Sequence, residues 1–273
     1  MGSSNSTQYA LLTDGRLYAW GLGTHGQLGN GRSRNAFRRP VRLPFSNVST
    51  LAGASNHAVY DADGTVYACG QNLHGTLGDG STRSSTRPVT VAGLDGAEVS
   101  RLVASFANAG ALLKNGEYYN WGFNGNGQLG NGHPGRSAGV PVRVRLPFPV
   151  TEVAQGGSYW NNGQTLALLS DGSLWSWGDN WAHQLGTSAK GMRPSPVRIH
   201  PPAGVSYQRL ASGSATSYAV TATGDVYAWG TGRVGQVGNG QTGTATRPVL
   251  VASGAAAISS TANNVVISLA AAT

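Results

Sequence analysis

The sequence predicts an all-β fold, a β-propeller of four-stranded blades with about 50 residues each. Three observations support this prediction: a repeated Trp-Gly or Cys-Gly motif, a hairpin turn signal before each copy, and a strand that starts with proline after each copy. The motif begins at Trp20, Cys69, Trp121, Trp177 and Trp229, so its copies are 49, 52, 56 and 52 residues apart. Periods of this size are typical of solenoids, propellers and arrays.

The composition agrees with a fold of strands and turns. Glycine accounts for 41 of the 273 residues, about twice its usual share, and only 11% of the residues are charged. The glycines follow no three-residue period, which excludes collagen, and no apolar run is long enough to span a bilayer. The net charge of +8 comes almost entirely from arginine, with Lys114 and Lys190 the only lysines. The longest basic run is Arg38–Arg39, so we interpret the charge as scattered, and the preference for arginine suggests a bacterial source.

Cysteine and the first residues bear on the compartment. Cys69 is the only cysteine, which excludes a disulfide within the chain and a cysteine-based metal site. Residues 1–7 have no signal-sequence pattern. We expect no signal peptide or transmembrane segment here, and a chain that is cytoplasmic or secreted with its signal removed.

Each repeat opens with a hairpin. Dipeptides typical of two-residue type I′ turns occur at Asp14-Gly15, Asp63-Gly64, Asn115-Gly116 and Asp171-Gly172, with Thr223-Gly224 as a weaker version. An aromatic residue lies two positions before each motif, at Tyr18, Tyr67, Tyr119, Trp175 and Tyr227. Alternate residues of a strand share one face, so we expect these aromatic residues and the motif tryptophans to form layers of the interior. Cys69 takes the place of a core tryptophan and should be a buried small hydrophobe.

The rest of each repeat supplies two more strands. A glycine-rich loop follows the motif, and a short strand then starts at Pro40, Pro88, Pro141, Pro196 or Pro248. A connecting strand comes next, as at residues 48–52 and 207–211. The chain thus holds five complete repeats plus an extra terminal strand at residues 264–269. We expect one β-propeller domain over residues 1–273, and the sequence leaves open a small ring, an open ring or a piece of a longer protein.

The glycine-rich loops carry a family resemblance. Gly26-Gln-Leu-Gly-Asn-Gly31 recurs at residues 127–132, and close variants stand at residues 75–80 and 235–240, while Ala182-His-Gln-Leu-Gly186 departs from the pattern. Together with the Trp-Gly motifs they resemble the regulator of chromosome condensation repeat family. The resemblance implies a propeller, usually of seven blades, that displays loops to protein partners. The architecture also resembles, more distantly, the β-lactamase inhibitor protein II.

No catalytic constellation stands out. Three GxGxxG matches, at residues 21–26, 125–130 and 230–235, are followed by no helical periodicity, so we interpret them as structural glycines and not as a dinucleotide site. We expect no cofactor and no metal site, and the sequence favours a protein that is not an enzyme.

Departures from the repeat indicate a candidate binding site. The stretch from Val153 to Gly172 is 19 residues long, whereas the equivalent stretch from Leu102 to Gly116 is 14. The loop before each hairpin and the loop after each Trp-Gly should meet at one end of the blade, and aromatic residues gather there in repeats three and four. The candidate binding residues are Trp160, Trp181, Tyr159, Phe106, Phe123, Asn108, Asn161, Asn124 and His183. Tryptophan and tyrosine are enriched at binding hot spots, so these loops predict a protein-binding rim.

Other functions stay open at this point. The same aromatic loops could enclose an apolar small molecule in a cofactor-independent enzyme of the cyclase or lyase type. The resemblance also implies nucleotide exchange on a small GTPase. Light sensing is disfavoured, because the Gly-Trp-Arg-His-Thr string of the plant UV-B photoreceptor is missing. A protein is the favoured partner and a small apolar molecule the second candidate, while neither nucleic acid nor a membrane is expected.

Overall fold

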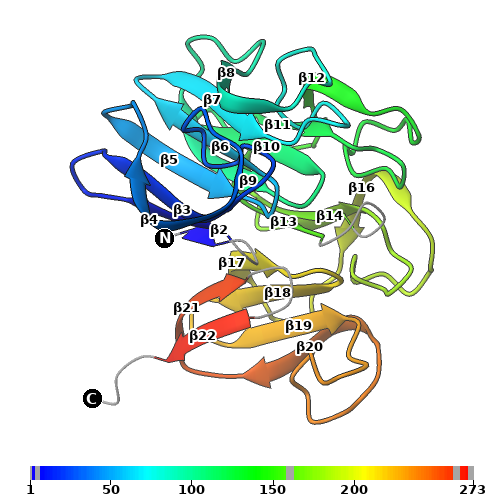
Figure 1. The fold of residues 1–273 in the computed structure, drawn as a ribbon. Coiled ribbons are helices and arrows are strands. Elements are labelled where there is room, and N and C mark those ends of the chain that lie inside the picture. The colour runs from blue at the N-terminus through cyan, green and yellow to red at the C-terminus, as the bar shows by residue number, and fades with distance from the viewer. Residues whose placement is uncertain (1, 4–6, 158–162, 261–264, 270–273) are drawn as a thin grey trace. The chain divides into compact units, whose positions relative to one another are not determined.

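A computed structural model describes the chain apart from residues 1, 4–6, 158–162, 261–264 and 270–273. The described residues form strands and turns and contain no helix. They make five four-stranded antiparallel sheets and one two-stranded sheet, each with its strands in sequence order (Figure 1). The prediction of all-β, four-stranded propeller blades is confirmed.

The chain divides into two compact units, which are described separately. Unit 1 comprises residues 1–124 and 136–144, and unit 2 comprises residues 125–135 and 145–273. The sheets of unit 1 are β1 (Gly2–Ser3), β2 (Thr7–Leu11), β3 (Leu17–Gly23) and β4 (Arg34–Arg42); β5 (Val48–Gly53), β6 (His57–Ala62), β7 (Thr65–Gly70) and β8 (Ser85–Thr90); and β9 (Val99–Ala104), β10 (Asn108–Leu113), β11 (Tyr118–Gly122) and β12 (Ala138–Arg143). The sheets of unit 2 are β13 (Val150–Gly156), β14 (Gln164–Leu169), β15 (Leu174–Gly178) and β16 (Arg193–Ile199); β17 (Tyr207–Ser212), β18 (Thr216–Thr221), β19 (Val226–Gly230) and β20 (Ala245–Ala252); and β21 (Ala255–Ser260) with β22 (Val265–Leu269). The single domain over residues 1–273 stays a prediction.

The connecting strands open the next sheet. β5 follows the Pro40 strand in sequence, yet it pairs with β6 of the following hairpin. β9, β13 and β17 do the same in their own sheets. Each of these blades therefore takes its first strand from the preceding repeat, which couples neighbouring repeats through the chain itself. The extra terminal strand predicted from the sequence is β22, which pairs with β21.

The prediction of type I′ turns is correct for one hairpin and wrong for the other four. Asp63 and Gly64 both have positive φ, at 52° and 77°, as a type I′ turn requires. In the other four turns only the glycine has positive φ, and its N–H donates to the carbonyl three residues earlier, as Gly15 does to Leu12 at 3.0 Å. This is a type I turn followed by a left-handed glycine. At Asp14 the side chain accepts the Arg16 N–H at 3.1 Å, a local bond that favours the type I geometry.

Three motif tryptophans bind each blade to the loop before it. Trp121, Trp177 and Trp229 are 0% exposed, and each donates its indole N–H to a backbone carbonyl in the glycine-rich loop of the preceding repeat. The acceptors are Thr76, Gln128 and Gln184, at 2.9, 3.0 and 2.9 Å. A buried indole N–H needs such a partner, so the Trp-Gly motif of one repeat and the glycine-rich loop of the preceding repeat stabilise each other.

The other expected core positions differ from one another. Cys69 is 0% exposed, which confirms the prediction of a buried small hydrophobe. Its thiol donates to the Gln27 carbonyl at 3.4 Å, and the Tyr9 hydroxyl donates to the same carbonyl at 2.9 Å. Trp20 is only half-buried, whereas the other four motif positions are fully buried; no loop of the Gln-Leu-Gly type precedes Trp20 in this sequence. The aromatic residues two positions before each motif are half-buried as well, and lie at the margin of the core.

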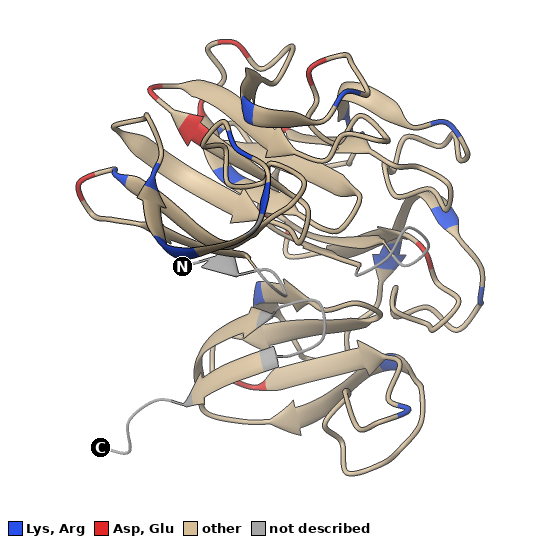
Figure 2. Ribbon diagram, in the orientation of Figure 1, with Lys and Arg blue, Asp and Glu red and all other residues tan. Residues whose placement is uncertain are grey.

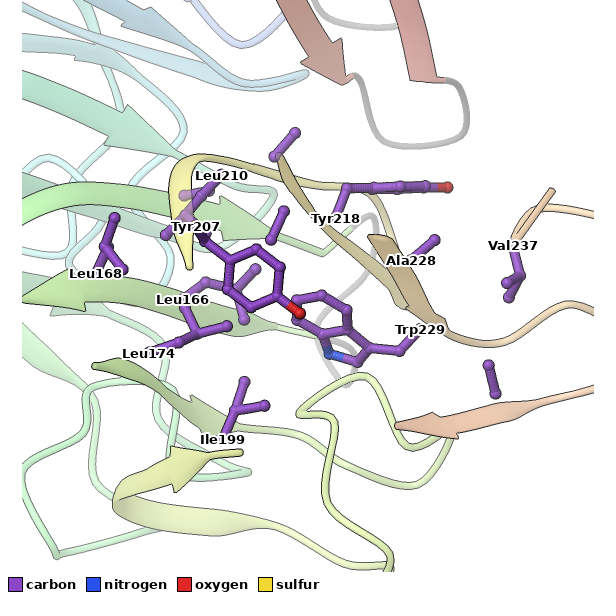
Figure 3. Close-up of a cluster of buried hydrophobic side chains, with 14 residues drawn as sticks. Leu166, Leu168, Leu174, Ile199, Tyr207, Leu210, Tyr218, Ala228, Trp229 and Val237 are labelled. Carbon is purple, nitrogen blue, oxygen red and sulfur yellow. The ribbon is translucent and has the colours of Figure 1, made fainter. Parts of the chain in front are cut away.

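Apolar side chains fill the space between neighbouring sheets. One cluster in unit 2 joins β14 to the hairpin of β18 and β19 and includes Leu166, Tyr218 and Trp229 (Figure 3). Two similar clusters in unit 1 surround Trp121 and Cys69. The loops at the strand ends are thereby held on packed sheets.

Candidate functional site

The loops that flank each hairpin meet at one end of the blade. Asn108 at the start of β10 pairs with Gly122 at the end of β11, and the Phe123 N–H donates to the Ala107 carbonyl at 2.9 Å. In unit 2 the Asp179 N–H donates in the same way to the Gly163 carbonyl. The predicted pairing of these two loops within a blade is confirmed.

The five residues after each Trp-Gly or Cys-Gly motif form what we call the tip loop. A glutamine in the glycine-rich segment holds the loop, because its side-chain carbonyl accepts a backbone N–H from the loop. Four such bonds occur, from His25 to Gln27, Asn126 to Gln128, Ala182 to Gln184 and Val234 to Gln236, at 2.8–2.9 Å. In the fourth repeat the Asn180 side chain adds bonds to the Leu185 N–H and the Ala189 carbonyl. Tip loops of this kind have a fixed backbone.

Large apolar side chains are exposed on three of these loops. Leu73, Trp181 and Val234 are 56%, 65% and 82% exposed, each on the tip loop of its own sheet. Exposed apolar residues scattered singly need no explanation, but these three occupy the same loop of the repeat. The tip loop thus displays an apolar side chain in three repeats, while the other exposed large apolar residues are spread over different parts of the chain: Leu12, Val140, Phe148, Met192, Leu250 and Val266.

The predicted aromatic site is only partly covered by the described residues. Trp160, Tyr159 and Asn161 lie outside them, in the 158–162 gap. Trp181 is the most exposed tryptophan side chain described. Phe106 and Phe123 are half-buried, and the Phe123 ring packs edge-on against His74 with 4.9 Å between ring centroids.

Three of the predicted polar residues have structural roles. Asn108 is 2% exposed, and its side chain donates to the Trp121 and Phe123 carbonyls at 3.2 and 2.6 Å. Asn124 is 0% exposed. His183 is 7% exposed and has a φ of 58°, in the position where the other repeats have glycine, and its ring nitrogen lies 3.1 Å from the Thr187 carbonyl. Burial of these side chains leaves them little surface for a partner, a property that sequence spacing does not reveal.

A buried carboxyl group supports the loop that carries Trp181. Asp179 is 3% exposed and accepts a bond of 2.5 Å from the Gln184 side chain. Burial raises the pKa of Asp179, while the bonds from Gln184 and from the Trp181 and Asn180 N–H groups act in the opposite direction. Asp179 thus holds the Gln184 side chain, whose carbonyl accepts the Ala182 N–H in the loop that carries Trp181.

The sequence interpretation missed a concentration of positive charge. Residues 15–60 contain six arginines and no aspartate or glutamate. Four of them, Arg34, Arg38, Arg39 and Arg42, lie on β4, where blue segments follow the strand in Figure 2. The description of the charge as scattered is therefore wrong for this part of the chain. A count of charges along each repeat, in place of a search for basic runs, would have found it.

The described residues contain neither a metal-ligand cluster nor a membrane-spanning helix. No three His, Cys, Asp or Glu side chains in this part of the chain are grouped as a metal ion would require. No helix long and apolar enough to cross a membrane occurs in it.

Comparison with known proteins agrees with this architecture. The fold and its tip loops define a propeller protein whose repeats are joined by tryptophan hydrogen bonds to the preceding glycine-rich loop. Five stretches of the chain match the regulator of chromosome condensation (RCC1) repeat, at residues 14–60, 63–105, 115–159, 171–220 and 223–267. The chain belongs to this repeat family.

Relatives show the same family in larger proteins. The chain is 33% identical over 244 residues to the mitochondrial RCC1 domain-containing protein RUG3 of Arabidopsis thaliana, covering 84% of the chain and 53% of RUG3. It is 30% identical over 255 residues to the human E3 ubiquitin-protein ligase HERC2, covering 89% of the chain and 5% of HERC2. Yeast RCC1 (Prp20), solved bound to Kap60, superposes with a TM-score of 0.81 at 22% identity, covering 95% of this chain and 63% of that one. The chain thus spans about half of RUG3 and a small part of HERC2.

Proposed function

We propose that this RCC1-repeat propeller binds a protein partner through its tip loops, centred on Trp181. Phe106 and Phe123, which flank the hairpin of the third repeat, stay predicted binding residues of that repeat, and Trp160 and Tyr159 stay predictions from the sequence of the fourth repeat. The exchange-factor alternative is a special case of this proposal, in which the partner is a small GTPase. The yeast RCC1 structure with Kap60 shows that a protein with this fold binds another protein.

The observation that carries the proposal is the exposure of Trp181 on a fixed loop. The indole is 65% exposed, while its neighbours Asn180 and Ala182 are hydrogen-bonded to the buried residues Leu185 and Gln184. A tryptophan presented in this way can enter a partner's pocket with little further loss of backbone entropy. Side chains of this type supply a large part of the energy at protein interfaces.

The test compares Trp181→Ala with Arg233→Ala. Arg233 occupies the same tip-loop position in the fifth repeat and is exposed. Partners captured from the source organism by the unmodified chain are purified, and their affinities for both variants are measured by calorimetry. Trp181→Ala should cost at least about 2 kcal/mol, roughly 30-fold in Kd, and Arg233→Ala should have little effect.

Melting temperatures serve as the control for folding. Both side chains are exposed, so both variants should melt as the parent does. If the two substitutions weaken binding equally, or not at all, the tip loop of the fourth repeat is not the binding site. Thr216 in the fifth repeat is unsuitable as a control, because it is 4% exposed and bonded to the Thr231 carbonyl.

A further inference from the structure

An open cavity lies in unit 1 beside the outer strands of the first two sheets. Its volume is about 730 Å³, within the range of small-molecule sites. Arg42 and Arg87 line it together with Asn30, while Pro44, Phe45 and Pro88 supply apolar wall. No carboxylate lines the cavity. This lining is independent of the tip loops proposed above as a protein-binding surface.

Arg42 differs from Arg143, its counterpart in the third sheet, in having no ion-pair partner among the described residues. Arg143 occupies the same place in the Pro-Val-Arg segment of the third sheet, and it pairs with Glu117 at 2.8 Å. Arg198 occupies it in the fourth sheet, where hydrogen bonds from Ser173 lower the pKa of Asp171 most and the Arg198 charge lowers it further.

In the first sheet the turn carboxylate is already engaged. Asp14 binds the Arg16 guanidinium at 2.7 Å, and among the described residues Arg42 makes no ion pair. The guanidinium of Arg42 is exposed, so it remains available to an anion from solution.

Arg87 brings a second cation to the cavity from β8. A Cβ added at Gly31 would lie 3.3 Å from its Nε atom, so this side chain lies over the glycine-rich loop of the first sheet. Within the described residues it makes no ion pair either. The next pair of sheets carries Val140 in place of Arg87 and Thr90 in place of Arg42. The two cations are thus a feature of this junction and not of the repeat.

Asn30 adds an unused donor to the wall. Its Oδ1 accepts the Arg32 N–H at 3.0 Å, whereas its Nδ2 is buried and has no partner among the described residues. In the second repeat the equivalent residue is Asp79, which accepts a bond from Asn72. Glycine at position 23 takes the place of Asn72 in the first repeat. A buried donor without an acceptor is costly, but this nitrogen is inaccessible to solvent, so Asn30 contributes to the wall and the two arginines provide the groups that an anion can reach.

We propose that this cavity binds a small organic anion, a carboxylate or phosphate group attached to an apolar body. Two guanidinium groups match the charge of such oxyanions, and each can donate two hydrogen bonds to a pair of their oxygens. Phe45 and the two prolines provide contact area for the apolar part. The six arginines of residues 15–60, with no acid among them, give the approach to the cavity a positive potential that attracts anions.

The experiment uses phenyl phosphate as the probe and calorimetry or NMR titration of the whole chain as the readout. We expect saturable binding with a Kd of about 1 mM or below. Arg42→Gln and Arg87→Gln should each weaken binding about tenfold or more, because each removes a charge-assisted hydrogen bond. Arg143→Gln and Arg198→Gln are the matched controls and should change it less than about twofold. All four side chains are exposed, so equal melting temperatures confirm that each variant folds.

Two further probes test separately whether the ligand needs its anionic group and its apolar body. Inorganic phosphate should bind more weakly than phenyl phosphate, and neutral benzyl alcohol should not bind. The proposal is overturned if phenyl phosphate fails to saturate, if Arg42→Gln and Arg87→Gln both bind as the parent does, or if the two controls lose as much affinity. Equal binding of phosphate and phenyl phosphate would overturn the assignment of an apolar body to the ligand.

Discussion

The hydrogen-bond acceptor near a buried position restricts which residue types fit there. At position 69 a thiol takes the place of an indole, yet it donates to the same kind of acceptor, the Gln27 carbonyl. The Tyr9 hydroxyl donates to that carbonyl as well. Burial raises the pKa of Cys69 to about 12, so the thiol stays protonated and acts as a core residue.

His57 should make the stability depend on pH. It is 0% exposed, and burial lowers its pKa from 6.5 to about 4. Between these values the unfolded state binds more protons than the folded state, so the free energy of unfolding should fall as the pH is lowered from about 6.5 to about 4. The difference between the two pKa values corresponds to about 3 kcal/mol.

Urea unfolding at pH 7 and pH 4.5 measures this dependence. His57→Gln should reduce the difference in the free energy of unfolding between the two pH values, whatever its effect at pH 7. His200→Gln, at an exposed position, should leave that difference unchanged. An undiminished difference in His57→Gln would assign the acid sensitivity to other groups.

At the scale of the element, the glycine-rich loop and the tryptophan strand behave as one unit. Gly130 has a φ of 68°, and a Cβ there would lie 2.7 Å from the Trp177 indole nitrogen. Gly135 also has positive φ, at 94°, but a Cβ there would meet nothing within 4 Å. The two positions share the backbone strain of alanine and differ in the contact with tryptophan.

Gly130→Ala should therefore be more destabilising than Gly135→Ala. The left-handed conformation costs either alanine about 1–2 kcal/mol, and crowding of Trp177 should add about 1–3 kcal/mol at position 130 only. The measurement is the free energy of unfolding in urea. An equal decrease in the free energy of unfolding for the two variants would mean that the loop can move away from Trp177 without loss of stability.

Substitution of the motif tryptophans tests the same contact from the other side. Trp229→Ala should cost about 3–5 kcal/mol, because it empties a fully buried position and leaves the Gln184 carbonyl without its indole donor. Trp20→Ala should cost less, since Trp20 is half-buried. A loss under about 1 kcal/mol for Trp229→Ala would contradict the role given to the motif.

At the scale of the whole molecule, the repeats are linked both by shared sheets and by the tryptophan contacts. Residues 125–135 connect β11 to β12, two strands of unit 1, but they belong to unit 2. Gln128 in this segment accepts the Trp177 indole bond. The segment gives a reason to expect that residues 1–273 unfold together, as one domain does.

Calorimetry tests that expectation. A single transition with equal calorimetric and van't Hoff enthalpies would indicate one cooperative domain. Two resolved transitions would contradict it and assign separate stabilities to the two units. In repeat proteins each repeat is coupled mainly to its neighbours, so weakening one contact between repeats can split the unfolding transition. Trp177→Phe removes the indole N–H bond to Gln128. We expect it to broaden or split the transition more than Trp229→Phe does.

The sequence by itself determined the blades. Turn dipeptides such as Asp63-Gly64, the Trp-Gly spacing and the Pro-Val segments act within a few residues, so they can be identified without a structure. The predicted starts of the proline strands were wrong, because each of these strands begins three to six residues before its proline. The same patterns placed the paired loops at one end of each hairpin and located Trp181 on an exposed loop. These patterns did not predict the turn type correctly, because the Asp14 carboxylate accepts the Arg16 N–H and this bond favours another turn over the two-residue turn.

Only the tertiary structure decided which side chains are covered and which charges are paired. Asn108 and Asn124 stand in loops by sequence but are buried, whereas Trp20 shares the core motif but is half-buried. Arg42 and Arg87 come from different repeats and line one cavity, while Arg143, with the same local sequence as Arg42, is paired with Glu117. Desolvation and ion pairing depend on atoms that the fold brings together from distant parts of the chain, and a local pattern carries no information about them.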